Sequence, residues 1–178
     1  MTASTTPTPP PPPAGSPVSL REITADTVRD ITRLAVSPLQ AGNVADNATS
    51  IAQAYFDRAA WFRAVYAGDV PVGFVMIEDQ TLLEGETRPA EPEVGLWRFM
   101  IDQRFQGRGF GAEAIALLVA HVSTRPGIHR LWCSCVPGPH SPRGFYEKLG
   151  FVATGAVDDG EEVLLLDLKP LAGPARAP

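Results

Sequence analysis

Three glycines at alternate positions follow an apolar run in the middle of the chain, where they can bind an anionic ligand. The segment Gln106-Gly107-Arg108-Gly109-Phe110-Gly111 joins a predicted buried strand, Val94 to Ile101, to a predicted amphipathic helix, Gly109 to Ser123. Glycines let backbone N–H groups approach a ligand, and a helix N-terminus offers unpaired donors and partial positive charge. Arg104 and Arg108 add charge at the rim. The pattern predicts a phosphate or pyrophosphate site, although such glycines also serve as plain turn residues.

Two other phosphate-binding loops do not fit this segment. A P-loop ends in Gly-Lys-Ser/Thr, whereas Gly111-Ala112-Glu113 stands here. A dinucleotide fingerprint needs G-x-G-x-x-G and an acidic residue at the end of the next strand. The last glycine spacing is shorter here, and Pro137-Gly138 follows the next predicted strand.

The elements around the glycine loop alternate in type. Hydrophobic alternation and turn residues predict strands at 18–23, 62–66, 72–78, 94–101, 130–136 and 163–168. Helices are predicted from Thr24 or Asp26 to about Val36, over 47–56, over 109–123, and from Ser141-Pro142 to Gly150. Residues 67–69 turn a hairpin, and residues 81–93 are polar and turn-rich. This order predicts an α/β or α+β domain with a mixed sheet.

Length and composition predict one folded domain between two loose ends. The 178 residues are 44% hydrophobic, which suits a single packed core and excludes a wholly disordered chain. Residues 1–17 hold seven prolines and no charged side chain, which predicts a disordered Pro-rich tail. Residues 171–178 are expected to form a loose C-terminal tail, so the folded domain covers 18–170.

The net charge, the apolar runs and the cysteines exclude some classes of partner and indicate where the protein is located. With 15 Lys+Arg against 20 Asp+Glu, the net charge of −5 argues against nucleic-acid binding. The sequence contains no apolar run of 18 residues, so no membrane span is predicted. Residues 1–17 lack the positive charge of a secretory signal, so a cytoplasmic location is expected. Cys133 and Cys135 are too close in sequence for an ordinary disulfide and have no metal-ligand cluster nearby. We expect buried thiols on a strand and no metal.

A second motif follows the glycine loop after one helix and one strand. Gly144-Phe145-Tyr146-Glu147-Lys148-Leu149-Gly150-Phe151 places a Tyr just before a Leu-Gly-Phe ending. Together with Gln106-x-x-Gly109-x-Gly111, it resembles the GNAT acetyltransferase superfamily. The resemblance covers nearly the whole folded domain and implies a mixed central sheet of about six to seven strands, flanked by about four helices. Leu96 to Asp102 and Asn47 to Tyr55 resemble the bacterial spermine/spermidine-type acetyltransferases.

The resemblance implies an N-acetyltransferase that moves an acetyl group from acetyl-CoA to a small primary amine by direct attack on the thioester. Backbone groups of Phe99, Met100 and Ile101 would pair with the pantetheine arm, beside a neighbouring strand that splays away. Amides of the loop would hold the pyrophosphate, namely Gln106, Gly107, Arg108, Gly109, Phe110, Gly111 and Ala112. Tyr146 would protonate the leaving thiolate, since a phenol is protonated at neutral pH. The alternative for Tyr146 is an aromatic packed on the core.

This sequence departs from the superfamily pattern at two positions. Many relatives carry an Asn seven residues before the Tyr, where Pro139 stands here, so Ser141 or His140 would replace that coenzyme contact. Some relatives carry a Glu base on the strand before the Tyr helix, and this strand has no carboxylate. Glu93, at the start of the strand that leads into the glycine loop, is a candidate base. His140 and water without a dedicated base remain alternatives.

The acceptor and the functional class are open at this level. A polyamine would favour several carboxylates near the cleft, and the chain offers two acidic groups: Glu78, Asp79, Glu91 and Glu93, or Asp158, Asp159, Glu161 and Glu162. An aminoglycoside, an amino acid or a protein amine are other acceptors. A non-catalytic coenzyme-binding sensor and a proline-tail adaptor are the alternatives from other classes. An exposed sheet edge leaves a homodimer open.

Overall fold

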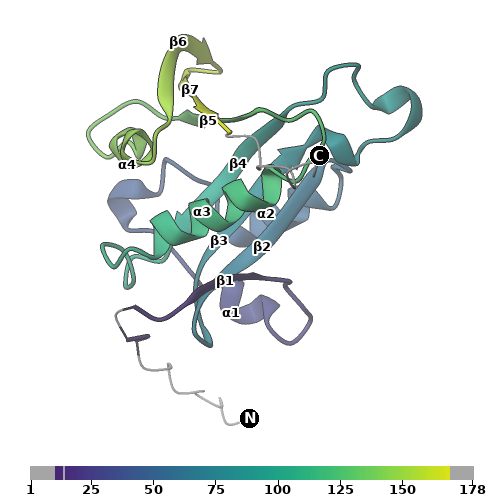
Figure 1. Ribbon diagram of the computed structural model, residues 1–178. Helices are drawn as coiled ribbons and strands as arrows, with labels where there is room; N and C mark the ends of the chain where they lie inside the picture. Colours follow the sequence, from purple (N-terminus) through teal and green to yellow (C-terminus); the bar gives the residue numbers. More distant parts are fainter. Residues whose placement is uncertain (1–10, 14, 169–178) are drawn as a thin grey trace, which may run out of the picture.

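A seven-stranded mixed sheet organises the protein (Figure 1). The computed structural model describes residues 11–13 and 15–168. The strands lie in the order β1-β2-β3-β4-β5-β7-β6, and every neighbouring pair is antiparallel except β4 and β5, which are parallel. Their bounds are β1 Val18–Arg21, β2 Ala60–Ala67, β3 Val70–Asp79, β4 Val94–Ile101, β5 Arg130–Cys135, β6 Val152–Asp158 and β7 Glu161–Asp167. The predicted class, a mixed sheet with helices, is confirmed.

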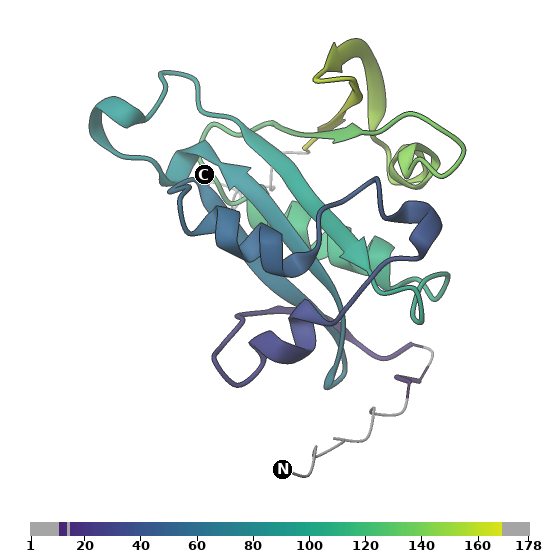
Figure 2. The ribbon, with the colours of Figure 1, turned by 180° about the vertical axis from the view of Figure 1, so that it is seen from behind.

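Helices cover both faces of the sheet and divide the core into two layers. On one face lies α3 (Phe110–Val122), and α1 (Val28–Thr32) and α2 (Asn47–Ala54) lie on the other (Figures 1 and 2). The fourth helix, α4 (Arg143–Lys148), follows β5, and short 3₁₀ turns occur at Pro38–Gln40, Gln80–Leu82 and Gly85–Thr87. The cluster under α3 includes both cysteines of β5, which are buried free thiols as predicted. Among the helices of residues 11–13 and 15–168, none is sufficiently long and apolar to cross a bilayer.

The predicted helix that follows the first strand is shorter in the structure. The prediction ran to Val36, but α1 ends at Thr32. Just beyond it, the Ala35 N–H donates to the Asp102 carboxylate, and the Ala35 carbonyl accepts from the Gln103 N–H. Because these long-range bonds occupy the backbone groups that another helical turn would use, the segment leaves the helix.

The strand β6 was missed by sequence reasoning. Its side chains are mostly exposed, because it is an edge strand that pairs only with β7, so burial imposes no alternation on its sequence. Gly155 has φ +81°, and the pairing with β7 is interrupted between Ala153 and Val157. The helix α4 also begins later than expected, with Pro142 rather than Ser141 as its N-cap.

The predicted ends of the chain lie largely outside the described residues. The C-terminal tail, 171–178, lies there entirely, as do residues 1–10 and 14 of the predicted N-terminal tail. Within the described part, β1 begins at Val18 and β7 ends at Asp167. The domain bounds of 18–170 stay a prediction.

Candidate active site

The strands β4 and β5 pair at one end only. Their register joins Gly95 to Trp132 and Leu96 to Cys133, and beyond that point the strands part. On its other edge, β4 stays paired with β3 through Ile101. Among the described residues, no strand therefore pairs with the β5-facing edge of Phe99–Ile101. The predicted splay is confirmed, and it leaves the backbone groups on this edge without a strand partner and available to a ligand, except for the Ile101 carbonyl, which accepts from the Gln106 side chain.

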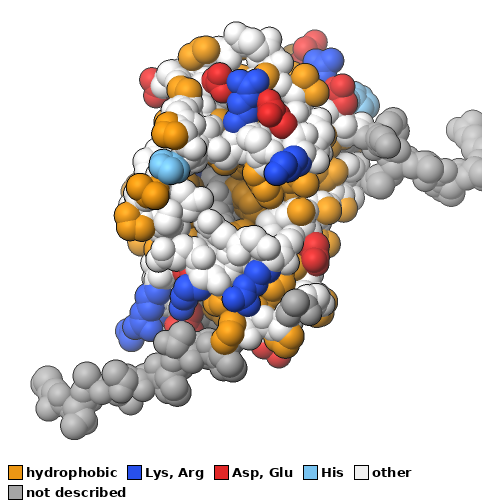
Figure 3. All heavy atoms as spheres, turned by 90° about the vertical axis from the view of Figure 1, so that its left-hand side faces the viewer, with side chains coloured by type: hydrophobic (Ala, Val, Ile, Leu, Met, Phe, Trp, Pro, Cys, Tyr) orange, Lys and Arg blue, Asp and Glu red, His pale blue; other side chains and the backbone are white. Residues whose placement is uncertain are grey.

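A cavity of about 600 Å³ opens where the two strands part. Figure 3 shows a hollow on the side of the molecule where α3 begins, with hydrophobic side chains on its floor. All predicted site residues except Glu93 and Arg108 line this cavity. The segment between α1 and α2 contributes further lining residues, namely Val36, Gln40, Asn43 and Val44. The volume of the cavity is in the usual range for small-molecule sites.

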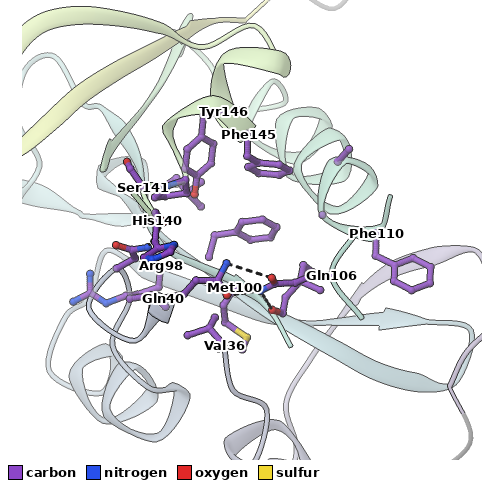
Figure 4. A pocket seen from close by; sticks show the side chains of 18 of the residues that line it. Val36, Gln40, Arg98, Met100, Gln106, Phe110, His140, Ser141, Phe145 and Tyr146 are labelled. Atoms are coloured by element: carbon purple, nitrogen blue, oxygen red, sulfur yellow. Dashed lines mark hydrogen bonds between the residues drawn. The ribbon is translucent and has the colours of Figure 1, made fainter. Parts of the chain in front are cut away.

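The glycine loop is held in one conformation beside the start of α3. Gly107 has φ +75°, and Gly109, the N-cap of α3, has φ +89°. The Gln106 side chain donates to the Ile101 carbonyl at 2.9 Å and is hydrogen-bonded to Gln40 (Figure 4). These contacts fix backbone N–H groups at the N-terminus of a 13-residue helix, which is a suitable place for a phosphate.

Tyr146 reaches the cavity from α4. Only 6% of its surface is exposed, and its ring makes edge contacts with Phe145 and Phe151 at centroid distances of 5.2 and 5.4 Å. Figure 4 shows the hydroxyl end directed toward the other lining side chains. Burial raises the pKa of Tyr146 well above its ordinary value, and the neighbouring Cys133 and Cys135 add to this. The hydroxyl therefore keeps its proton near neutral pH and can donate it.

The structure does not bring Glu93 or Arg108 to the cavity. Both side chains are exposed. Glu93 precedes β4 and exchanges hydrogen bonds with Gln80. It lies three residues before Leu96, the first residue of β4 that lines the cavity, which is about 10 Å of extended chain. Their roles as base and as phosphate ligand stay predictions.

Neither acidic group lines the cavity, since no Asp or Glu is among the described residues around it. Asp79 is fully buried and bonded to Arg125 at 2.8 Å, while Glu162 accepts two hydrogen bonds from Arg143. Of these carboxylates, Glu161 is linked to the cavity through one side chain: it accepts a hydrogen bond from the hydroxyl of Ser134, which does line the cavity.

Sequence reasoning missed the roles of several lining side chains. Arg98 lies inside the segment that resembles the spermine/spermidine-type acetyltransferases, but that resemblance implies no role for it. Ser134 occupies the strand position next to two buried cysteines and gives no signal. Asn43 donates to the His140 carbonyl at 2.6 Å, so it joins the α1–α2 segment to the β5–α4 loop across 97 residues of sequence. A contact of that length has no local signature.

The end of β4 is anchored by a buried carboxylate. Asp102 is 2% exposed, and it accepts from the Ala35 N–H and from the backbone and guanidinium of Arg104, at 2.7 to 3.0 Å. Burial by itself would raise the pKa of Asp102, but the hydrogen bonds from Arg104 and Ala35 together lower it below its ordinary value. The charged form is thus favoured in the folded protein.

Replacing Asp102 with Asn is expected to reduce the free energy of unfolding by about 2 kcal/mol at pH 7, because charge-assisted bonds are lost. A depressed pKa in the folded state stabilises the protein above the unfolded pKa near 3.9, and this contribution is lost as pH falls through the folded value. The wild type should therefore lose its advantage over Asp102→Asn below about pH 4. Urea unfolding at several pH values measures this.

The exposed Asp30 provides the matched control, since it makes only a surface pair with Arg33 at 3.7 Å. Asp30→Asn should change the free energy of unfolding by less than about 0.5 kcal/mol at any of these pH values. An equal loss of unfolding free energy in both variants would contradict the role of Asp102 as a charged anchor. So would a difference between the wild type and Asp102→Asn that grows as the pH falls.

Comparisons with known proteins give one family and two kinds of relative. Residues 25–151 match the family described as Acetyltransferase (GNAT) family. Among curated proteins, a spermine/spermidine N(1)-acetyltransferase of Bacillus subtilis strain 168 is 31% identical over 104 residues. That segment is 58% of this chain and 66% of the relative, so the chain spans just under two thirds of the relative's length.

Solved structures share the fold at low identity. A structure described as AtaTR bound with AcCoA has a TM-score of 0.61 and 20% identity, over 85% of this chain and 94% of its own. An acetyltransferase from Thermus thermophilus has a TM-score of 0.60 and 19% identity, over 85% and 97%. The family match covers well over half of the chain and includes the splayed strands, the glycine loop and Tyr146. The chain therefore belongs to the GNAT family of acetyltransferases.

Proposed function

We propose that this protein transfers an acetyl group from acetyl-CoA to a small primary amine. The observation that carries the proposal is the cavity between the parted strands, which brings together a free backbone edge, a fixed glycine loop and a buried Tyr. The edge of Phe99–Ile101 suits the amide-rich pantetheine arm, and the loop amides suit the pyrophosphate. The residues present thus fit acetyl-CoA as the acetyl donor.

The chemistry is a direct transfer with one proton accepted and one donated. The neutral amine attacks the thioester carbonyl carbon, a C–N bond forms, and the C–S bond breaks. Tyr146 donates its proton to the leaving thiolate sulfur, and the attacking nitrogen loses one proton. The products are the N-acetylated amine and coenzyme A as a free thiol. Tyr146 regains a proton from solvent before the next turnover.

The proton acceptor for the amine is open among three candidates. His140 lines the cavity, and a neutral imidazole has a ring nitrogen that can accept a proton. Water without a dedicated side-chain base is a second route. Glu93 is the third, at a greater distance along the chain. A pH–rate profile of Glu93→Gln that keeps its shape and height would eliminate Glu93.

Polyamines are the acceptor class that the curated relatives suggest, since one is named a spermine/spermidine N(1)-acetyltransferase. An aminoglycoside or a protein amine remains an alternative acceptor, and a non-catalytic coenzyme-binding sensor is the alternative function. Independence from nucleic acid, a cytoplasmic location and a homodimer stay predictions.

The first test is free thiol release from acetyl-CoA with a panel of amines: spermidine, spermine, simple diamines, aminoglycosides, amino acids and peptides. We expect release that depends on an added amine and saturates with it. Thermal stabilisation by coenzyme A should accompany it, because a ligand that binds the folded state stabilises it.

The two readouts distinguish the alternatives. Stabilisation by coenzyme A without thiol release for any amine would favour the sensor. Neither stabilisation nor release would contradict the assignment of the cavity to the coenzyme.

A further inference from the structure

Arg98 is the one strongly basic side chain among the described residues that line the cavity. A β-bulge places it there: Met76 pairs with Arg98 and Ile77 with Leu96, so Trp97 is an extra residue in β4. Bulges redirect side chains and are common beside functional sites. In Figure 4, Arg98 lies with His140 on the opposite side of the cavity from Gln106 and Phe110.

The guanidinium of Arg98 is only partly satisfied. Its Nη1 donates to the Trp97 carbonyl at 2.9 Å, and its central carbon lies 5.2 Å from the centre of the Trp97 ring. Its Nε is buried, and among the side-chain N and O atoms of the described residues it is the buried one without a hydrogen-bond partner. No described residue accepts a hydrogen bond from Arg98 Nη2, and Nη2 is not among the buried atoms, so an acceptor on a ligand can pair with it.

Few negative charges compensate Arg98. Burial lowers the pKa of Arg98 below its ordinary value, and the charge of Glu161 opposes this, yet a guanidinium remains protonated. Glu161 accepts a hydrogen bond from Ser134, whereas the hydrogen bond of the Arg98 side chain goes to the Trp97 carbonyl. Because no carboxylate of the described residues lines the cavity, its interior is net positive.

This charge pattern favours one kind of amine. A polyamine would bring several positive charges toward an under-compensated cation, which is repulsive at short range. An amine that also carries an anionic group would pair that group with Arg98 and leave its amino group for the thioester. A single guanidinium balances a single negative charge, so a carboxylate suits this site better than a phosphate dianion, for which several cations are usual.

We propose that Arg98 binds the carboxylate of the acceptor, which is therefore an amino acid or a similar amine with a carboxylate in the same molecule. The proposal rests on the proposed acetyl transfer and narrows its acceptor class. The coenzyme does not account for Arg98, because the loop amides that suit its phosphates lie across the cavity (Figure 4).

Matched acceptors test the proposal directly. Ornithine and lysine are compared with putrescine and cadaverine, which lack only the carboxylate, and phosphoethanolamine with ethanolamine. We expect kcat/KM at least about tenfold higher for the carboxylated member of each diamine pair. Equal or better turnover of putrescine and cadaverine would overturn the proposal, and so would a clear preference for the phosphorylated amine.

A variant series isolates the side chain. Arg98→Gln should raise KM for ornithine by about 10- to 100-fold, close to the putrescine level, with the affinity for coenzyme A unchanged within twofold. The KM of Arg98→Lys for ornithine should lie between the values for the wild type and Arg98→Gln, because lysine keeps the charge but loses the planar guanidinium. The matched control is Arg33→Gln, which removes an exposed guanidinium that pairs with Asp30. A parallel loss for ornithine and putrescine, or weaker coenzyme binding, would assign Arg98 another role.

Binding calorimetry keeps this test independent of catalysis. Ornithine and putrescine are titrated into the protein with coenzyme A bound, for the wild type and for Arg98→Gln. Tighter binding of ornithine that Arg98→Gln abolishes would support the carboxylate site even without turnover, and silence in the thiol assay would then count against the acetyl transfer alone. Equal binding of the two ligands to the wild type would overturn the carboxylate site.

Discussion

Tyr146→Phe is expected to lower kcat by about 10²- to 10⁴-fold, the usual contribution of a positioned general acid. The change removes one oxygen and its proton and leaves the ring, which packs between Phe145 and Phe151. Burial holds the pKa of Tyr146 well above its ordinary value, so the wild type has the proton available at every pH at which the protein works. Steady-state thiol release measures the loss.

The affinity for coenzyme A should change little in Tyr146→Phe, because only the transferable proton is gone. Tyr55→Phe is the matched control: it makes the same chemical change at a side chain that is 84% exposed and outside the cavity. Unchanged turnover in Tyr146→Phe would remove Tyr146 from the acid role and leave it as a packed aromatic. A loss of coenzyme binding would show that the hydroxyl acts on the ground state.

The sequence predicted the central strands and α3 well because local chemistry determines them. Val94–Ile101 is apolar except for Arg98, as expected of a largely buried strand, and its bounds are those of β4. The helix α3 begins and ends within one residue of its prediction, because the glycine loop marks its start and an apolar stripe defines its length. These elements carry most of the predicted coenzyme site.

The predictions fail where contacts between residues that are far apart in the sequence determine the local structure. The end of α1 depends on Asp102, which is far along the chain, and the edge position of β6 removes the burial pattern that would reveal it. The same holds for the side of the cavity that carries Arg98. Asn43 and Ser134 reach it only after the sheet is assembled, and the position of Arg98 at the cavity depends on a bulge in β4.

The carboxylates illustrate the difference between composition and geometry. Four acidic residues near β4 and four near the β6–β7 turn offered a site for a polycation. In the structure, Asp79 is buried against Arg125, and Glu162 is bound by Arg143. Charge in the sequence predicted that carboxylates were present, but only the fold determined which partners neutralise them. Among the described residues, the cavity is lined by the guanidinium of Arg98 and by no carboxylate, which is the basis of the proposed carboxylate-bearing acceptor.

Gly109→Val is expected to abolish coenzyme binding. Gly109 is the N-cap of α3, lines the cavity and has φ +89°, a conformation that favours glycine. A Cβ there would meet no other atom within 4 Å, so the new side chain would project into open space rather than clash with the fold. That space is where a phosphate must approach the loop amides, and a branched side chain would block it. Calorimetric titration with coenzyme A measures the loss.

Strain at the backbone must be distinguished from loss of the binding site, and Gly127 allows this. It has φ +80°, nothing within 4 Å of its Cβ position, and a place in the loop after α3, outside the cavity. Gly127→Val should therefore lower the free energy of unfolding by about 1 to 2 kcal/mol and still bind coenzyme A normally. Gly109→Val should show the same cost in urea unfolding and no binding. If Gly109→Val bound coenzyme A fully, the amides of the glycine loop could not be the phosphate ligands, and the coenzyme would have to enter the parted strands in another orientation.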